Sequence, residues 1–299
     1  MITQMSWRKL ARAGAVLLES AIMNFPKFWA KASNDALTCW RWSNASLHEA
    51  QQLAEEAVRQ LADRVRVSGW PTQRYGYSDR PLREPVLREF TNADGSLAAA
   101  VTRNAYGCHV LNTARALFVD IDLPEPKPSG GLLKKLFGKP EPANAPSPEA
   151  AALARIESWT RARPGWGWRV YRTRAGLRLL ATHDGFDPEA PETDAVFDQL
   201  GADPLYRRLC RAQKCFRARL TPKPWRCGLR PPDARWPWVD TKAEARFASW
   251  ENRYREASRD NATCALVKTL GNAQIHPSLQ PLLALHDEVT RVGATLPLA

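Results

Sequence analysis

The sequence of 299 residues has no long hydrophobic run. A membrane-spanning helix needs roughly 18 to 20 consecutive apolar residues, and no stretch approaches that length, so no such helix is expected. The sequence also lacks a Walker A motif, a Gly-x-Gly-x-x-Gly motif and a Gly-x-Ser-x-Gly motif. A P-loop NTPase, a Rossmann dehydrogenase and a serine hydrolase therefore have no support.

Cysteine is scarce and irregularly spaced. There are six cysteines and no Cys-x-x-Cys pair. Cys210, Cys215 and Cys227 lie closest together, but no histidine follows at ligand spacing, so buried free thiols are favoured over a structural zinc site. Because no disulfide framework is indicated, we expect a cytoplasmic, reducing environment.

Positive charge is what the sequence has in excess. Lys and Arg number 43 against 31 Asp and Glu, which gives a net charge of +12. The excess is concentrated in residues 203–235, where ten basic residues face two acidic ones. A polyanionic partner is expected, and nucleic acid is the commonest one.

The sequence divides into four segments. Residues 1–22 are expected to be an N-terminal extension, because their apolar stretch of about six residues is shorter than a signal peptide needs. Met1, Met5 and Met23 are all possible starts. Residues 23–123 and 149–240 are interpreted as the core, with 241–299 as a C-terminal helical segment.

Residues 124–148 interrupt this core as a flexible Pro/Gly-rich insertion with seven prolines. Within it, residues 132–139 form a short, basic, amphipathic patch. A solvated loop and a docking peptide for a partner are both compatible with that pattern.

The periodicities predict a mixed α/β (α+β) fold. In this prediction, an N-terminal α/β segment packs on the main sheet and helices close the C-terminus. The strand carrying Asp120, a hairpin over 168–182 and a strand over 215–220 are expected to share one sheet. The remaining predicted strands are 36–42 and 97–103, and the predicted helices are 47–65, a short piece near 85–90, 148–162, 189–200, 203–214, 242–260 and 279–292.

Asp120 and Asp122 are the sharpest local feature. Residues i and i+2 of a strand point to the same face, so the two carboxylates share one patch of solvent. A divalent cation such as Mg²⁺ or Mn²⁺ removes the cost of that repulsion. The alternative is that one aspartate caps a loop while the other pairs with an arginine.

The basic stretch strengthens the metal interpretation. Arg217 and Arg219 share a face of their predicted strand, as the two aspartates do on theirs. Two acids that hold a metal beside two arginines that hold phosphates are the apparatus of phosphoryl transfer. The alternatives are a phosphate-tracking surface and tryptophans that stack on single-stranded bases, with Trp225, Trp236 and Trp238 as the best stacking candidates.

The order of these motifs resembles the catalytic core of the archaeo-eukaryotic primase superfamily, which includes primase-polymerases. That core has an hDhD strand, a hairpin with a small-x-His motif, and an Asp followed by a Tyr-containing helix and an Arg-rich strand. The corresponding stretches here are Phe118-Val-Asp-Ile-Asp122, a hairpin containing Gly176-Leu-Arg178, and Asp203-Pro-Leu-Tyr206 followed by Phe216-Arg-Ala-Arg219. The resemblance covers residues 95–228 and implies an RRM-like catalytic sheet.

The resemblance also implies an activity, which is metal-dependent nucleotidyl transfer from nucleoside triphosphates on a nucleic-acid strand. Asp120, Asp122 and Asp203 would be the catalytic, metal-binding carboxylates. The expected nucleotide- and phosphate-binding residues are Arg172, Arg178, Arg217, Arg219 and Lys223.

The chain departs from the family pattern at Arg178, where the family has histidine. Arginine grips phosphates but does not transfer protons at neutral pH. Two alternatives therefore stay open, which are a catalytically inactive nucleic-acid or nucleotide-binding module of the same fold and a metal-dependent nuclease or phosphohydrolase. Convergence of the three aspartates would favour an enzyme, whereas a helix-capping role for Asp203 would favour the binding module.

Overall fold

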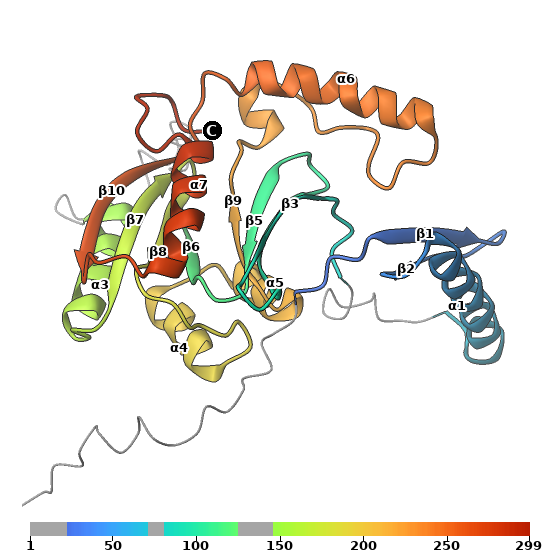
Figure 1. Cartoon of the computed structure of the whole chain (residues 1–299), viewed down its shortest axis with the longest axis horizontal. Helices are drawn as coiled ribbons and strands as arrows, with labels where there is room; N and C mark the ends of the chain where they lie inside the picture. Colours follow the sequence, from blue (N-terminus) through green and yellow to red (C-terminus); the bar gives the residue numbers. More distant parts are fainter. Residues whose placement is uncertain (1–22, 71–80, 125–145) are drawn as a thin grey trace, which may run out of the picture.

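The computed structural model describes residues 23–70, 81–124 and 146–299. Within these ranges the chain forms six α-helices and ten strands in three antiparallel sheets, which confirms the predicted α+β fold (Figure 1). The expected extension over 1–22 and the docking peptide at 132–139 lie outside the described residues. No helix in the described part of the chain is long and apolar enough to cross a membrane.

The N-terminal unit consists of the hairpin β1 (Phe28–Ser33) and β2 (Thr38–Ser43), covered by α1 (Leu47–Ser68). Ser46 caps the helix, since its hydroxyl accepts a hydrogen bond from the Glu49 N–H at 3.1 Å. The Glu49 carboxylate accepts from the Ser43 hydroxyl. This unit lies beside the second sheet and away from the central one, so it does not cover the predicted catalytic sheet (Figure 1).

The two larger sheets have four strands each. The central sheet has the order β10-β7-β8-β6, and the second sheet has the order β3-β4-β5-β9. The central strands are β6 (Phe118–Asp122), β7 (Gly167–Thr173), β8 (Gly176–Ala181) and β10 (Cys264–Gly271). The strands of the second sheet are β3 (Val86–Thr91), β4 (Leu97–Arg103), β5 (His109–Thr113) and β9 (Phe216–Arg219).

Helices cover both faces of the central sheet. The remaining α-helices are α3 (Pro148–Arg161), α4 (Pro191–Leu200), α5 (Pro204–Gln213), α6 (Thr241–Ala257) and α7 (Gln280–Thr290). On one face, Trp159 of α3 packs on Trp168 of β7, with ring centroids 5.8 Å apart. On the other face, His286 of α7 packs on Tyr171 of β7 at 4.8 Å. The main hydrophobic core lies between these layers.

Three sequence predictions about the fold are wrong. Strand β9 pairs with β5 in the second sheet, so the Arg-rich strand does not share a sheet with Asp120. The piece near 85–90 is strand β3, since its pairing with β4 overrides its local pattern. The segment 241–299 is not only helical, because β10 completes the central sheet along β7.

Candidate functional site

The site lies where the two four-stranded sheets adjoin, between β6, β8 and β9. The N–H of Asp203, just before α5, donates to the Asp120 carbonyl of β6 at 2.9 Å. The Tyr206 hydroxyl of α5 donates to the Phe118 carbonyl at 2.9 Å. Through these hydrogen bonds α5 holds the end of β6, and the predicted aspartates come to one place although 80 residues separate them in sequence.

Arg178 connects the two sheets from within. It stands opposite Asp120 in the pairing of β6 with β8. Its Nε donates to Asp120 Oδ1 at 2.8 Å and its Nη2 to Asp120 Oδ2 at 3.1 Å, while its Nη1 donates to the Arg219 carbonyl of β9 at 2.8 Å. Burial by itself lowers the pKa of Arg178, but the Asp120 carboxylate more than offsets this and the pKa is raised.

Asp120 is therefore already partnered. Both of its carboxylate oxygens accept from a guanidinium whose side chain is only 2% exposed. This is a bidentate, charge-assisted pair, the strongest form that an arginine–carboxylate contact takes. Arg178, at the position where the resemblance would place a histidine, thus supplies a permanent cation to Asp120.

Asp203 caps α5. Its Oδ1 and Oδ2 accept from the N–H groups of Leu205 and Tyr206, each at 3.2 Å, and Pro204 occupies the first turn as the cap motif favours. The same residue is close enough to Asp122 to act on its charge. Partial burial raises the pKa of Asp122, and the carboxylates of Asp203 and Asp120 raise it further.

The three carboxylates approach one another without forming a metal cage. In the described ranges no group of three or more His, Cys, Asp or Glu side chains is arranged to hold a metal ion. The donor chemistry agrees, since Asp120 is neutralised by Arg178 and Asp203 satisfies a helix terminus. Asp122 alone has no hydrogen-bond or ion-pair partner in the described part of the chain. The residues present do not fit the three-carboxylate Mg²⁺ or Mn²⁺ site that the resemblance implies.

Basic residues lie next to Asp122. Lys223, Arg219 and Arg226 are half-buried, and the last of these belongs to the short 3-10 helix η2 (Pro224–Cys227). Burial lowers the pKa of Lys223, and the neighbouring charges of Arg219 and Arg226 lower it further. Burial likewise lowers the pKa of Arg219, with Arg178 adding to the effect. Positive charge is thus crowded here.

An exposed aromatic ring adjoins this basic cluster. Trp225 is 47% exposed, and the Lys223 ammonium lies over its ring, 5.5 Å from the centroid. Tyr106 meets the same ring edge-on at 5.2 Å. Of the three tryptophans proposed for stacking, Trp238 packs against Phe247 under α6, whereas Trp225 is about half exposed.

Two predicted phosphate ligands lie elsewhere. Arg217 is buried in the second sheet, where its Nη2 donates to both carboxylate oxygens of Glu84 at 2.9 and 3.0 Å and its Nη1 to Asn112 at 2.6 Å. Arg172 lies on the α3 face of the central sheet and pairs with Glu149 at 3.0 Å. The structure brings Asp120, Asp122, Asp203, Arg178, Arg219 and Lys223 together and leaves these two arginines out.

Sequence reasoning missed a buried polar network behind Arg178. Asp287 of α7 accepts from Arg169 at 2.6 Å and from the Tyr171 hydroxyl at 2.9 Å, and its neighbour His286 is fully buried at 3.0 Å from it. Burial lowers the pKa of His286, so the ring is neutral at pH 7. Nothing in the local pattern of α7 distinguishes these residues, because their partners come from β7.

The chain shows no significant match to any protein-family model, curated protein or solved structure. The resemblance to the primase superfamily therefore rests on the order of the motifs in the sequence.

Proposed function

We propose that this protein is a binding module for single-stranded nucleic acid, built around the basic cluster of Arg219, Lys223 and Arg226 with Trp225 at its edge. The observation that carries the proposal is the crowding of these cations beside an exposed indole ring. Phosphates of a strand are attracted to these cations, and a base stacks on the ring.

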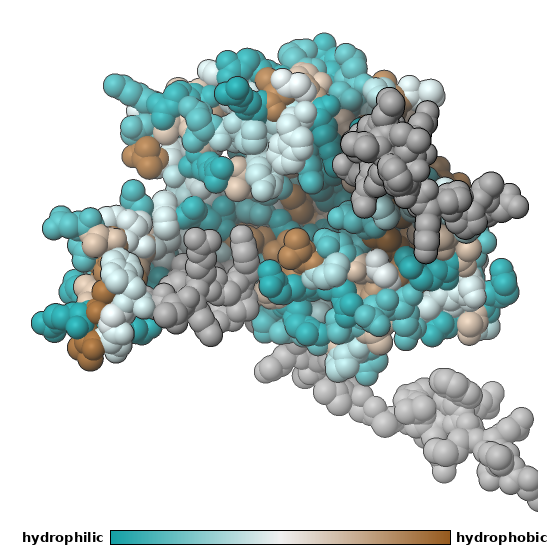
Figure 2. All heavy atoms as spheres, turned by 180° about the vertical axis from the view of Figure 1, so that it is seen from behind, coloured by the Kyte–Doolittle hydropathy of each residue, from teal (hydrophilic) through white to brown (hydrophobic). Residues whose placement is uncertain are grey.

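The surface chemistry supports a polyanionic partner over a hydrophobic one. Seen from behind, the molecule is mostly hydrophilic, with hydrophobic side chains gathered in small separate patches (Figure 2). The net charge of +12 adds a long-range attraction for polyanions. A strand bound here is recognised mainly through its backbone and its stacked bases, so little sequence preference is expected.

Binding without turnover is favoured over catalysis by the state of the carboxylates. Asp120 carries a permanent guanidinium partner and Asp203 serves as a helix cap. The binding alternative requires no metal at either residue, and these contacts can persist when a strand is bound.

Fluorescence anisotropy with fluorescein-labelled dT15 and rU15 tests the proposal. Lys223→Gln and Trp225→Ala are each expected to weaken binding, the second by about 1–3 kcal/mol for one stacked base. The matched controls are Lys242→Gln on α6 and Trp70→Ala after α1, both at exposed positions distant from the site in sequence and fold. Equal affinities for the site variants and their controls would contradict the proposal.

Nucleotidyl transfer stays a second candidate because Asp122 is unpartnered and lies within electrostatic reach of Asp203. Its test is the incubation of the protein with Mg²⁺ or Mn²⁺, labelled nucleoside triphosphates and a primed single-stranded template. Extension by the protein that disappears in Asp122→Asn would establish the enzyme. The same assay with a labelled strand and no nucleotides detects a nuclease through shortened products.

A further inference from the structure

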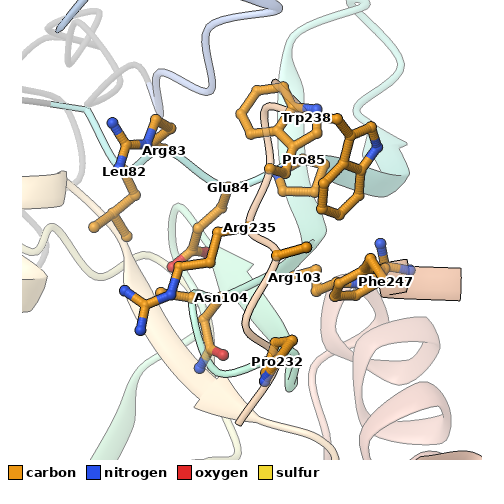
Figure 3. Close-up of a pocket in the computed structure, with 13 residues that line it drawn as sticks. Leu82, Arg83, Glu84, Pro85, Arg103, Asn104, Pro232, Arg235, Trp238 and Phe247 are labelled. Atoms are coloured by element: carbon orange, nitrogen blue, oxygen red, sulfur yellow. The ribbon is translucent and has the colours of Figure 1, made fainter. Parts of the chain in front are cut away.

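A second basic cavity lies on the far side of the Arg217–Glu84 pair. Its volume is about 190 Å³, and it lies between the segment before β3, the end of β4, the 232–238 segment and α6 (Figure 3). Three of the residues that line it are arginines, namely Arg83, Arg103 and Arg235. They come from three separate parts of the chain, so no local sequence pattern reveals the cluster.

The carboxylate that lines this cavity, Glu84, does not pair with these three arginines. Glu84 is the one carboxylate among the described lining residues, and it is only 6% exposed. Its oxygens already accept from Arg217 and, at 2.5 Å, from the Thr102 hydroxyl. The charge of Glu84 is therefore balanced by Arg217, while the guanidinium groups of Arg83 and Arg235 lie on one side of the cavity and that of Arg103 lies on the other side, beside Phe247 (Figure 3).

Two of the guanidinium groups, those of Arg83 and Arg103, lie over aromatic rings, and their hydrogen-bond donors are incompletely used. Arg83 lies over the Trp40 ring at 3.9 Å and has no carboxylate within ion-pairing distance in the described ranges. Arg103 lies over Phe247 at 4.7 Å and pairs with Glu251, but its buried Nε has no acceptor there. Burial lowers the pKa of both arginines, and Arg235 lowers that of Arg83 further.

We propose that this cavity binds one phosphate group of a nucleotide, with Arg83 and Arg235 as its ligands and Trp236 as the apolar wall beside it. A dianionic or monoanionic phosphate satisfies several guanidinium donors at once, because its separate oxygens match the bidentate geometry of arginine. The volume exceeds that of a few water molecules but is smaller than typical pockets for drug-sized ligands, which suits one phosphate with part of its nucleoside.

The proposal rests on the proposed function in one respect, namely the source of the phosphate. A strand that crosses the basic cluster at β9 and a free mononucleotide offer the same phosphoryl oxygens. The two sources are separated by the probes, which are fluorescein-labelled dT15, adenosine 5′-monophosphate and inorganic phosphate.

The experiment compares Arg235→Gln and the double variant Arg83→Gln/Arg235→Gln with Arg253→Gln, an exposed arginine of α6 outside the cavity. Binding of dT15 is followed by anisotropy at several salt concentrations, and binding of the small probes by calorimetry. We expect the double variant to lose affinity on the order of tenfold, with a salt slope shallower by about 1.4 for two lost contacts to a single strand. Because Arg235 is exposed, the single variant tests the proposal even if Arg83 is needed for folding.

The outcomes are distinct. Loss of dT15 binding assigns the cavity to a strand phosphate, and loss of adenosine 5′-monophosphate binding alone assigns it to a free nucleotide. If Arg235→Gln and the double variant bind every probe as Arg253→Gln does, the cavity proposal is wrong. If these variants lose affinity while Lys223→Gln does not, the cavity proposal stands and the proposed function at β9 is wrong.

Discussion

Each of the two large sheets buries one arginine against one carboxylate, and the two pairs have different surroundings. In the second sheet, Arg217 and Glu84 are each 7% exposed and share their remaining donors and acceptors with Asn112 and Thr102. In the central sheet, Arg178 is 2% exposed, but its partner Asp120 is 31% exposed at the edge of the candidate site. The first pair is closed off from solvent, whereas the second has one side open to it.

This difference distinguishes an arginine that stabilises the fold, Arg217, from one that lies at the candidate site, Arg178. A buried pair contributes little net stability compared with apolar side chains, but the loss of one partner leaves an uncompensated buried charge. Arg217 therefore joins β9 to the segment before β3. Arg178 both joins the sheets and forms an ion pair with Asp120.

The comparison predicts its largest effect at Arg217. Arg217→Met is expected to lower the free energy of unfolding by about 3–5 kcal/mol, because Glu84 is left buried and unpaired. Arg178→Met is expected to cost less, since water reaches the open side of Asp120. Urea denaturation measures both. The double variant Glu84→Leu/Arg217→Met should recover much of the lost free energy of unfolding. If Arg217→Met and Arg178→Met lower the free energy of unfolding equally, the proposed difference between the two pairs is wrong.

The next effect concerns the close approach of β6 and β8. A Cβ added at Gly176 would lie 2.0 Å from the Ile121 carbonyl oxygen, so the backbone must shift. Gly176→Ala is expected to destabilise the protein by about 1–3 kcal/mol, the usual cost of overpacking. Gly165→Ala is the control, as no atom lies within 4 Å of its added Cβ. Thermal unfolding of both variants is the measurement, and similar melting temperatures would count against this packing argument.

Substitutions of Asp203 are expected to have an intermediate effect on stability. Two variants distinguish the contribution of its helix-capping hydrogen bonds from that of its negative charge. Asp203→Ala removes the acceptors of the Leu205 and Tyr206 N–H groups and should cost about 1 kcal/mol, whereas Asp203→Asn keeps a capping side chain and should cost less. Both variants remove a negative charge next to Asp122, which itself lies beside Lys223, so both should bind labelled dT15 more tightly. If neither variant binds dT15 more tightly than the natural protein, Asp203 does not act on the basic cluster.

Asp122 is expected to give the smallest effect, visible as a pH dependence. Its pKa is raised in the folded protein, so ionisation of this carboxyl disfavours folding. The destabilisation is absent at a pH below the pKa of the unfolded chain. It develops as the pH rises from there to above the pKa of the folded protein. Asp122→Asn should therefore stabilise the protein at pH 7 by no more than about 1 kcal/mol, because solvent screens this exposed group. Urea denaturation at pH 7 and pH 3.5 should show the difference from the natural protein shrinking at the lower pH; a constant difference would contradict this assignment.

The elements were predictable where local pattern and packing agree. The apolar spacing after Ser46 predicts α1, and the run before Asp120 predicts β6. Strands β1, β5 and β10 were missed, and β3 was assigned to a helix. Their stability comes from pairing with other strands, a neighbouring one for β1, β3 and β5 and the distant β7 for β10, and not from their own residues alone.

For the candidate site, the sequence by itself determined which kinds of residue are available. These are two aspartates on one strand face and a stretch rich in arginine that also contains tryptophan. The strand period of two and the charge count are local properties, so they can be read without a fold. Only the tertiary structure decided which arginine meets which carboxylate. Arg178 and Arg217 are alike in sequence. Strand pairing places Arg178 opposite Asp120, whereas Arg217 meets Glu84 from the segment before β3, because ion pairs form between residues that the fold brings together across the chain.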